Sequence, residues 1–139
     1  MEYQKFHISI KGLIRYGDKF LLLQEDDGLW EAPGGRIDEG ELLKETLLRE
    51  LKEELGLNLK KENIGRLVSI DQRYDYKFGG GWGLVTLFYE IIPNEEPVIK
   101  ISQEHIDFIW VNKSSDLSRL VFKNSVQKDI FEEFRKSLK

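Results

Sequence analysis

The chain has no cysteine and only two histidines among its 139 residues. The lack of cysteine excludes disulfides, thiolate metal sites and cysteine nucleophiles, and only His7 and His105 offer imidazole chemistry. No apolar run approaches the ~20 residues that a transmembrane helix needs, and the N-terminal segment has no secretory hydrophobic region. We therefore expect a cytoplasmic protein with no membrane partner, in which any chemistry rests on carboxylates.

An excess of one charge sign is also missing. The 21 basic and 25 acidic residues give a net charge of −4, and hydrophobic residues make up 40% of the chain. This composition is typical of a globular protein and argues against both a disordered acidic chain and a basic binder of nucleic acid polymers. Because the chain is 139 residues long and has no repeat or linker, we expect one domain over residues 1–139.

Apolar and β-branched residues predict several strands. His7–Ile14 and Lys19–Gln24 flank a turn at Tyr16-Gly17-Asp18, which predicts a hairpin. The following GLWEAPGG segment predicts a loop or a very short strand. Later strands, separated by a GGGWG turn and a PNEEP loop, are predicted at Gly65–Phe78, Trp82–Ile92 and Ile106–Val111.

Two helices are predicted among these strands. Leucines recur at helical spacing between Glu41 and Leu55, and Gly56 stands where a left-handed residue ends a helix. Asn124, three residues before Gln127, predicts a capping box at the start of a second, amphipathic helix. The apolar stripe predicted for this second helix consists of Val126, Ile130, Phe131 and Phe134.

The first predicted helix carries several carboxylates on one side. At ~100° per residue, Glu50, Glu53 and Glu54 share an arc beside the leucine stripe, and Glu54 lies at the stripe's edge. We therefore expect Glu54 to be at least partly desolvated. Glu50 and Glu54 repel each other at i, i+4 spacing, and a divalent cation would reverse that effect. Alternatively, Arg49 neutralises Glu45 and Glu53 at i±4 spacing, which gives an ordinary charged surface.

A longer pattern surrounds these carboxylates. From Gly35 the chain reads five residues, Glu41, seven residues, Arg49-Glu50-Leu51, one residue, Glu53-Glu54, one residue and Gly56-Leu57. This spacing resembles the Nudix box, the signature of the Nudix hydrolase family, and every fixed position is matched. The resemblance implies an α/β fold, with an α/β/α sandwich around a mixed β-sheet.

The resemblance also implies a Mg²⁺-dependent hydrolase, with Mn²⁺ as a substitute. Mg²⁺ prefers oxygen ligands, which the resemblance assigns to the box and to a carbonyl of the loop before it: Glu50, Glu53, Glu54 and Gly34 or Gly35. Glu41 should pair with Arg49 and hold Glu50 in position. The metal would activate a water and stabilise displacement at one phosphorus of a pyrophosphate.

Members of the family place the general base differently, either within the box or on a loop ahead of a late strand. Glu50 and Glu53 are the box candidates here, and Glu104 resembles the loop position, as the base or as a further metal ligand. The alternative for Glu104 is an ordinary solvated glutamate, since sequence position does not show its reach. For His105 and His7 the structural interpretation is favoured.

Substrate recognition is predicted around an alternation of aromatic and charged residues. A strand there would carry aromatic rings on one face, on which a nucleobase could stack. The candidates for binding base or phosphate are Arg36, Arg73, Tyr74, Tyr76 and Trp82. The alternative is that these rings only cover the sheet. Trp30 and Trp110 are interpreted as core residues.

We therefore predict a Nudix hydrolase that cleaves a nucleoside diphosphate linked to another moiety, of the nucleotide sugar or nucleoside triphosphate type. A dinucleoside polyphosphate or an oxidised nucleotide is the alternative substrate. Two further alternatives are a non-catalytic Nudix-like nucleotide-binding module and a metal-free acidic helix in a structural protein. The expected partner is a small nucleotide, and a homodimer is left open.

Overall fold

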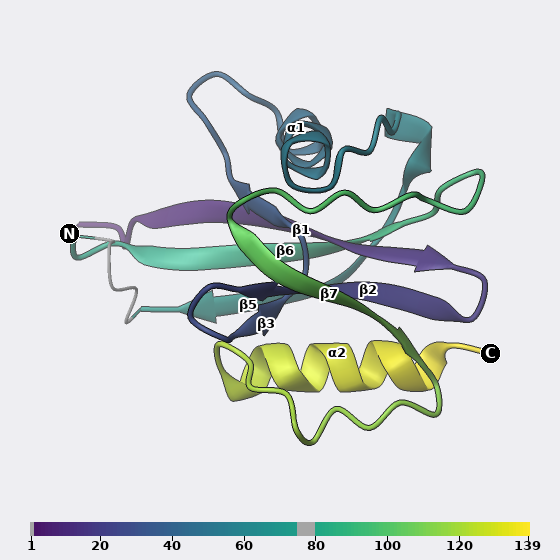
Figure 1. The fold of residues 1–139 in the computed structure, drawn as a ribbon. Helices are drawn as coiled ribbons and strands as arrows, with labels where there is room; N and C mark the ends of the chain where they lie inside the picture. The colour runs from purple at the N-terminus through teal and green to yellow at the C-terminus, as the bar shows by residue number, and fades with distance from the viewer. Residues whose placement is uncertain (1, 75–79) are drawn as a thin grey trace.

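The structure is a computed structural model that describes residues 2–74 and 80–139 (Figure 1). Within these residues the strands are β1 (Phe6–Tyr16), β2 (Lys19–Glu25), β3 (Trp30–Glu31), β4 (Gly34–Arg36), β5 (Ile64–Arg73), β6 (Gly83–Ile91) and β7 (His105–Asn112). The helices are α1 (Leu43–Leu55) and α2 (Ser125–Ser137), and a short 3-10 turn, η1, spans Lys61–Asn63. No helix in the described part of the chain is long and apolar enough to cross a membrane.

The strands form a mixed sheet in the order β3-β2-β1-β6-β5, with β4 paired to β1 and β7 paired to β2. The β1–β6 pair is parallel, whereas the other strand pairs are antiparallel. Helix α1 lies on one face of the sheet and α2 on the opposite face (Figure 1). The predicted α/β/α sandwich around a mixed sheet is therefore confirmed.

The predicted N-terminal hairpin is present, but its strands pair only next to the turn. The β1–β2 register joins Arg15 to Phe20 and Tyr16 to Lys19, and Gly17 adopts a φ of 62° in the turn. Beyond that end, β1 pairs with β4 and β2 pairs with β3. The two short strands come from the GLWEAPGG segment, so this segment is placed where the strands of the hairpin separate.

Each helix buries one apolar stripe against the sheet. Leucines of α1 pack with Ile10, Ile14 and Leu21, whereas phenylalanines of α2 pack with Phe20 and Phe88. Trp30 lies in the core on the α2 side, as predicted, and Trp110 packs partly buried against the core on the α1 side. Burial of apolar side chains is the main stabilising contribution of these layers.

Helix α1 begins two residues later than predicted. Glu41 stays outside the helix because its carboxylate accepts hydrogen bonds from the Asp38 backbone nitrogen at 2.9 Å and from Thr46 Oγ1 at 2.9 Å. The predicted end is confirmed: Gly56 has a φ of 70° and its backbone nitrogen donates to the Lys52 carbonyl oxygen at 2.9 Å.

Helix α2 begins after Asn124, whose Oδ1 accepts from the Gln127 backbone nitrogen at 2.8 Å. The reciprocal half of the predicted capping box is absent, because the Gln127 side chain donates to Asp71 instead. The prediction was also wrong for Val126, which is 46% exposed. At ~100° per residue Gln127 falls near the centre of the buried stripe and Val126 at its margin.

The later strands confirm the predicted order with small shifts at their ends. The strand predicted at Gly65–Phe78 is β5, which begins at Ile64 and ends at Arg73, and residues 75–78 of that prediction lie outside the described residues. Strand β6 begins one residue after Trp82, and β7 extends the predicted strand by one residue at each end.

Candidate active site

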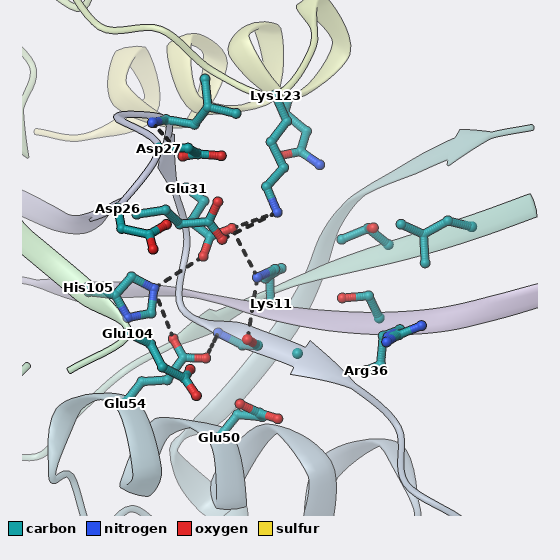
Figure 2. A pocket seen from close by; sticks show the side chains of 18 of the residues that line it. Lys11, Asp26, Asp27, Glu31, Arg36, Glu50, Glu54, Glu104, His105 and Lys123 are labelled. Atoms are coloured by element: carbon teal, nitrogen blue, oxygen red, sulfur yellow. Dashed lines mark hydrogen bonds and ion pairs between the residues drawn. The ribbon is translucent and has the colours of Figure 1, made fainter. Parts of the chain in front are cut away.

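A cavity of about 710 Å³ lies where the separated strands, α1 and the start of α2 meet. Its size falls within the usual range for small-molecule sites. In Figure 2, Lys123 and Glu50 lie at opposite ends of this pocket, with Lys11 and Glu31 between them. Charged side chains dominate its wall. The polar and charged residues that contact one another or face the pocket include Lys11, Glu31, Glu50, Glu54, Glu104, His105, Lys123 and Gln127.

Two glycines bring α1 close to the sheet at one end of the pocket. Gly34 has a φ of 144°, and a Cβ atom on it would lie 2.1 Å from the Ile10 carbonyl oxygen. A Cβ atom on Gly35 would lie 2.5 Å from Glu50 Oε1. Position 34 therefore requires glycine, whereas a side chain at position 35 would displace the Glu50 carboxylate. The Gly34 backbone nitrogen also donates to Glu54 Oε1 at 3.3 Å, which joins the loop to the helix.

Arg49 organises the carboxylates on the outer side of α1. Its guanidinium contacts Glu41 Oε2 at 2.7 Å, Glu50 Oε1 at 3.0 Å and Glu53 Oε2 at 3.3 Å. Hydrogen bonds from Arg49 lower the pKa of Glu41 to about 2. The expected Glu41–Arg49 pair is thus present, whereas the Glu45 carboxylate accepts from the Leu42 backbone nitrogen at 2.8 Å.

Glu54 is the most buried carboxylate of α1, at 4% exposure, so its expected desolvation is confirmed. Oxygen Oε1 accepts from Gly34, but Oε2 has no hydrogen-bond partner among the described residues. Burial raises the pKa of Glu54 to about 8. Lys11 acts in the opposite direction, and the neighbouring Glu50 and Glu31 carboxylates add to the rise. The helix therefore holds an incompletely partnered buried carboxylate at the pocket wall.

Glu31 is the centre of an ion-pair network in the middle of the pocket. Its Oε2 lies 2.8 Å from Lys123 Nζ and 3.4 Å from Lys11 Nζ, and its Oε1 lies 3.2 Å from His105 Nε2. Burial alone would raise the pKa of Glu31, but Lys11, His105 and Lys123 together lower it well below its usual range. Glu31 is therefore an ionised carboxylate with both oxygens engaged.

His105 and Lys11 connect this network to the glycine loop and α1. His105 Nε2 lies 3.7 Å from Glu54 Oε2, and Lys11 Nζ donates to the Gly34 carbonyl oxygen at 3.3 Å. His105, for which the structural interpretation is favoured, is a buried ring in the pocket wall between two carboxylates and is hydrogen-bonded to Glu31. His7 lies elsewhere, with its ring centroid 5.0 Å from that of Trp82.

Two groups of side chains differ in how well they suit a divalent cation. Ligand atoms of Glu25, Glu31 and His105 lie within 4.8 Å of one another. Lys11 and Lys123 already neutralise this group, so it does not fit a cation. At the α1 end, Glu54 Oε2, which has no hydrogen-bond partner among the described residues, and the Glu50 carboxylate line the same wall, and carboxylate oxygens are the donors that Mg²⁺ prefers.

Several predicted site residues meet in this pocket, and others do not. The predicted residues in its wall are Gly34, Gly35, Arg36, Glu50, Glu54, Arg73 and Glu104. Glu53 does not line it and its side chain is 59% exposed. Tyr74 packs against Phe6, with ring centroids 5.7 Å apart, and like Trp82 it does not line the pocket. Tyr76 lies outside the described residues.

The placement of Trp82 gives an expected result for a single substitution. We expect Trp82→Leu to leave KM unchanged within about twofold, measured with whichever nucleotide the parent protein hydrolyses with the highest kcat/KM. The reason is that the ring packs on His7 and does not line the pocket. Loss of the ring contact should lower Tm by roughly 2–6 °C, for an aromatic pair of about 1 kcal/mol. Steady-state kinetics and thermal unfolding test both. A tenfold rise in KM at unchanged Tm would instead support base stacking.

Four pocket residues with charged or amide side chains, Lys11, Glu31, Lys123 and Gln127, form contacts across the pocket that are not predicted from the sequence. Lys11 and Glu31 carry a weak signal, since each is a charged residue in an otherwise apolar segment, FHISIKGLI and LWEAP. Lys123 and Gln127 carry none, because only the tertiary fold brings the start of α2 next to β3. Glu31 and Lys123 are separated by most of the chain and lie 2.8 Å apart.

Residues 5–128 match the family model for the NUDIX domain. The chain belongs to the Nudix hydrolase family. A bis(5'-nucleosyl)-tetraphosphatase (asymmetrical) of Mus musculus is 30% identical over 107 residues, which cover 76% of this chain and 71% of that protein. A CTP pyrophosphohydrolase of Escherichia coli is 35% identical over 69 residues, which cover 46% of this chain and 49% of that protein.

Solved structures of the family have the same fold. The MutT protein of Methanosarcina mazei superposes with a TM-score of 0.75 at 25% identity and covers 98% of this Nudix chain and 97% of its own. The E. coli ORF135 protein superposes with a TM-score of 0.73 at 24% identity, covering 94% and 90%. Nudix enzymes act on small nucleotide substrates and generally use divalent metals, which agrees with a hydrolase whose pocket holds carboxylates.

Proposed function

We propose that this Nudix hydrolase is a Mg²⁺-dependent pyrophosphohydrolase that cleaves a nucleoside diphosphate linked to another moiety, of the nucleoside triphosphate or nucleotide sugar type. The supporting observation is one pocket with the box carboxylates at one end and polar groups of β3 and α2 at the other. Its volume of about 710 Å³ suits a ligand of nucleotide size.

The α1 end of the pocket is the proposed metal site. Glu50 and Glu54, with a carbonyl of Gly34 or Gly35, would hold the ion, and Glu53 or Glu104 could add a further oxygen. Bound Mg²⁺ supplies charge neutralisation at phosphate oxygens and lowers the pKa of a bound water. Arg49 holds the Glu50 carboxylate in place through its 3.0 Å contact.

The remaining roles follow from position in the pocket. Arg36 and Arg73 line its wall and are the proposed contacts for the substrate phosphates. Glu104 lines the same wall and is the proposed general base that takes a proton from the attacking water. Glu50 is the alternative base within the box.

A dinucleoside polyphosphate is the second candidate substrate. It is favoured by the name of the mouse relative, a bis(5'-nucleosyl)-tetraphosphatase.

The proposal is tested with a panel of nucleoside triphosphates, nucleotide sugars, ADP-ribose and dinucleoside polyphosphates in the presence of Mg²⁺. We expect cleavage of one phosphoanhydride bond with release of a nucleoside monophosphate or another phosphorylated fragment, and loss of that cleavage on chelation. Product identification by phosphorus NMR or mass spectrometry names the bond that breaks. Binding of these nucleotides without any turnover would favour the non-catalytic alternative.

The buried Glu54 carboxyl predicts a pH dependence of stability for the metal-free protein. Its pKa rises from 4.5 to about 8 on folding, so between these values the folded state holds a proton that the unfolded chain has released. The free energy of unfolding should therefore fall as pH rises through this window and level off above it, by at most ~1.4 kcal/mol per pH unit.

The matched comparison is with Glu54→Gln, which lacks the titrating group. Glu25, whose pKa burial and Glu31 raise to about 7, adds a slope of the same sign that is common to both proteins. Urea denaturation with chelator present gives the unfolding free energy of both proteins. The value for the parent protein minus that for Glu54→Gln should fall as pH rises from 4.5 to about 8. A difference that is constant with pH would contradict the desolvation of Glu54.

A further inference from the structure

We propose that the end of the pocket opposite the Nudix box selects a nucleobase with a lactam edge, in which a ring carbonyl adjoins a ring N–H. Guanine, hypoxanthine, uracil and thymine have this edge. Adenine and cytosine present an amino group beside an unprotonated ring nitrogen instead. The inference rests on the proposed function and adds to it the class of base.

Lys123 supplies the hydrogen-bond donor. Its Nζ lies 2.8 Å from Glu31 Oε2 and 3.7 Å from Glu25 Oε1, and these two contacts fix the position of the ammonium group. An ammonium has three N–H donors, so at least one is left for a ligand. The side chain is 27% exposed and forms part of the pocket wall (Figure 2). A carbonyl oxygen is the matching group on a base.

Gln127 supplies the acceptor. Its Nε2 donates to Asp71 Oδ2 at 3.2 Å, and Asn124 Nδ2 donates to the same oxygen at 3.1 Å. Because Asp71 Oδ2 accepts from the amide nitrogen, this contact fixes the orientation of the Gln127 amide. The amide oxygen receives no hydrogen bond from the described residues, and Gln127 lines the pocket. The amide oxygen can accept a hydrogen bond from a ring N–H.

The carboxylate best placed to bind an amino group is already occupied. Both oxygens of Glu31 are engaged, Oε2 by Lys11 and Lys123 and Oε1 by His105. An amino group directed at the Lys123 ammonium would therefore meet a group that has no acceptor to offer. Glu31 acts on the ligand by holding the lysine in place.

The charges at this end favour a neutral ring over a second phosphate group. Glu25, Asp26 and Asp27 line the pocket close to Glu31, so the carboxylates there outnumber the two lysines. A further anion would be repelled, whereas a neutral heterocycle would not. Leu29 also lines this wall and offers an apolar surface for the plane of a ring.

Two pairs of substrates test the inference on the unaltered protein. ITP and ATP differ only in the lactam or amino edge of the purine, and UTP and CTP differ in the same way. We expect kcat/KM to be roughly ten- to a hundredfold higher for the lactam member of each pair, chiefly through KM, because the amino member leaves polar groups of the site unpaired.

The outcomes separate the inference from the proposed function. Turnover of all four nucleotides with equal kcat/KM, or with ATP and CTP preferred, would overturn the base selectivity and leave the hydrolase standing. Absence of turnover for every phosphoanhydride in the wider panel would overturn the proposed function, and the inference with it.

A matched pair of variants assigns the selectivity to one side chain. Lys123→Met should bring the ITP to ATP ratio of kcat/KM close to one by raising KM for ITP. Lys113→Met, which removes an exposed lysine outside the pocket, should keep the parental ratio. Lys123→Gln retains an N–H donor and should keep a preference for ITP even if the methionine variant fails to fold. A purely structural Lys123 would slow both nucleotides equally and leave the ratio unchanged.

Discussion

Replacing Glu54 by glutamine should lower Mg²⁺-dependent hydrolysis by on the order of 10³-fold while leaving the fold intact. Glu54 is buried, faces the pocket, and has an oxygen with no hydrogen-bond partner among the described residues. A metal at this position contributes several kcal/mol of transition-state stabilisation, and each 1.36 kcal/mol corresponds to a factor of ten in rate. Loss of a ligand should therefore reduce kcat severely.

The substitution should not destabilise the metal-free protein at neutral or alkaline pH. A glutamine at position 54 can still accept from the Gly34 backbone nitrogen, and it removes a carboxylate whose ionised form is disfavoured by burial. The affinity for Mg²⁺, measured by calorimetry in the absence of substrate, should fall together with kcat. That measurement separates the loss of a ligand from a general loss of structure.

Glu45→Gln is the matched control on the same helix. Glu45 lies on the exposed side of α1, where its carboxylate accepts from the Leu42 backbone nitrogen, and a glutamine can replace that contact. We expect near-parental turnover and Mg²⁺ affinity. Near-normal turnover of the Glu54→Gln variant would show that Glu54 is not a metal ligand.

The α1 end of the pocket could be predicted because its determinants are local. Helical periodicity places Glu50 and Glu54 on the side of the leucine stripe, and the burial of Glu54 follows from that position. Gly34 and Gly35 precede the helix in the same segment; a Cβ atom on Gly34 would meet the backbone of β1, and one on Gly35 would meet the Glu50 carboxylate. A single continuous segment therefore encodes this end of the pocket.

The opposite end could not be predicted, because its contacts join distant segments. Lys123 pairs with Glu31 only because the chain crosses the sheet several times before it reaches α2. Gln127 shows the same limit on a smaller scale. The pattern of apolar residues assigns Val126 to the stripe instead, and the burial of Gln127 as a polar residue depends on Asp71 of β5.

The aromatic segment is a less direct guide to the binding site for a related reason. Alternation of aromatic and charged residues places the rings on one face of a strand but does not say what that face meets. Trp82 meets His7, and Tyr74 meets Phe6, so both rings pack on β1 instead of lining the pocket. This placement is consistent with the proposed recognition of the base by hydrogen-bonding groups at the start of α2.

Replacing Glu104 by glutamine should lower kcat by roughly 10²- to 10⁴-fold with little change in KM, the usual range for the loss of a positioned proton acceptor. The loop that carries Glu104 is tied to α1, because the Ser102 backbone nitrogen donates to the Glu54 carbonyl oxygen at 2.9 Å. The Glu104 backbone nitrogen in turn donates to Ser102 Oγ at 3.3 Å. These contacts hold Glu104 at the α1 end of the pocket, where water would attack (Figure 2).

Comparison with Glu50→Gln distinguishes a general base from a metal ligand. If Glu104 is the base, its glutamine variant keeps the parental affinity for Mg²⁺ and loses the pH dependence of kcat on the acid side, because that limb reports protonation of the base. If Glu104 is a ligand, the affinity for Mg²⁺ falls along with kcat. Near-parental kcat for Glu104→Gln, with a large loss for Glu50→Gln at unchanged Mg²⁺ affinity, would place the base within the Nudix box and leave Glu104 as a solvated residue of the loop.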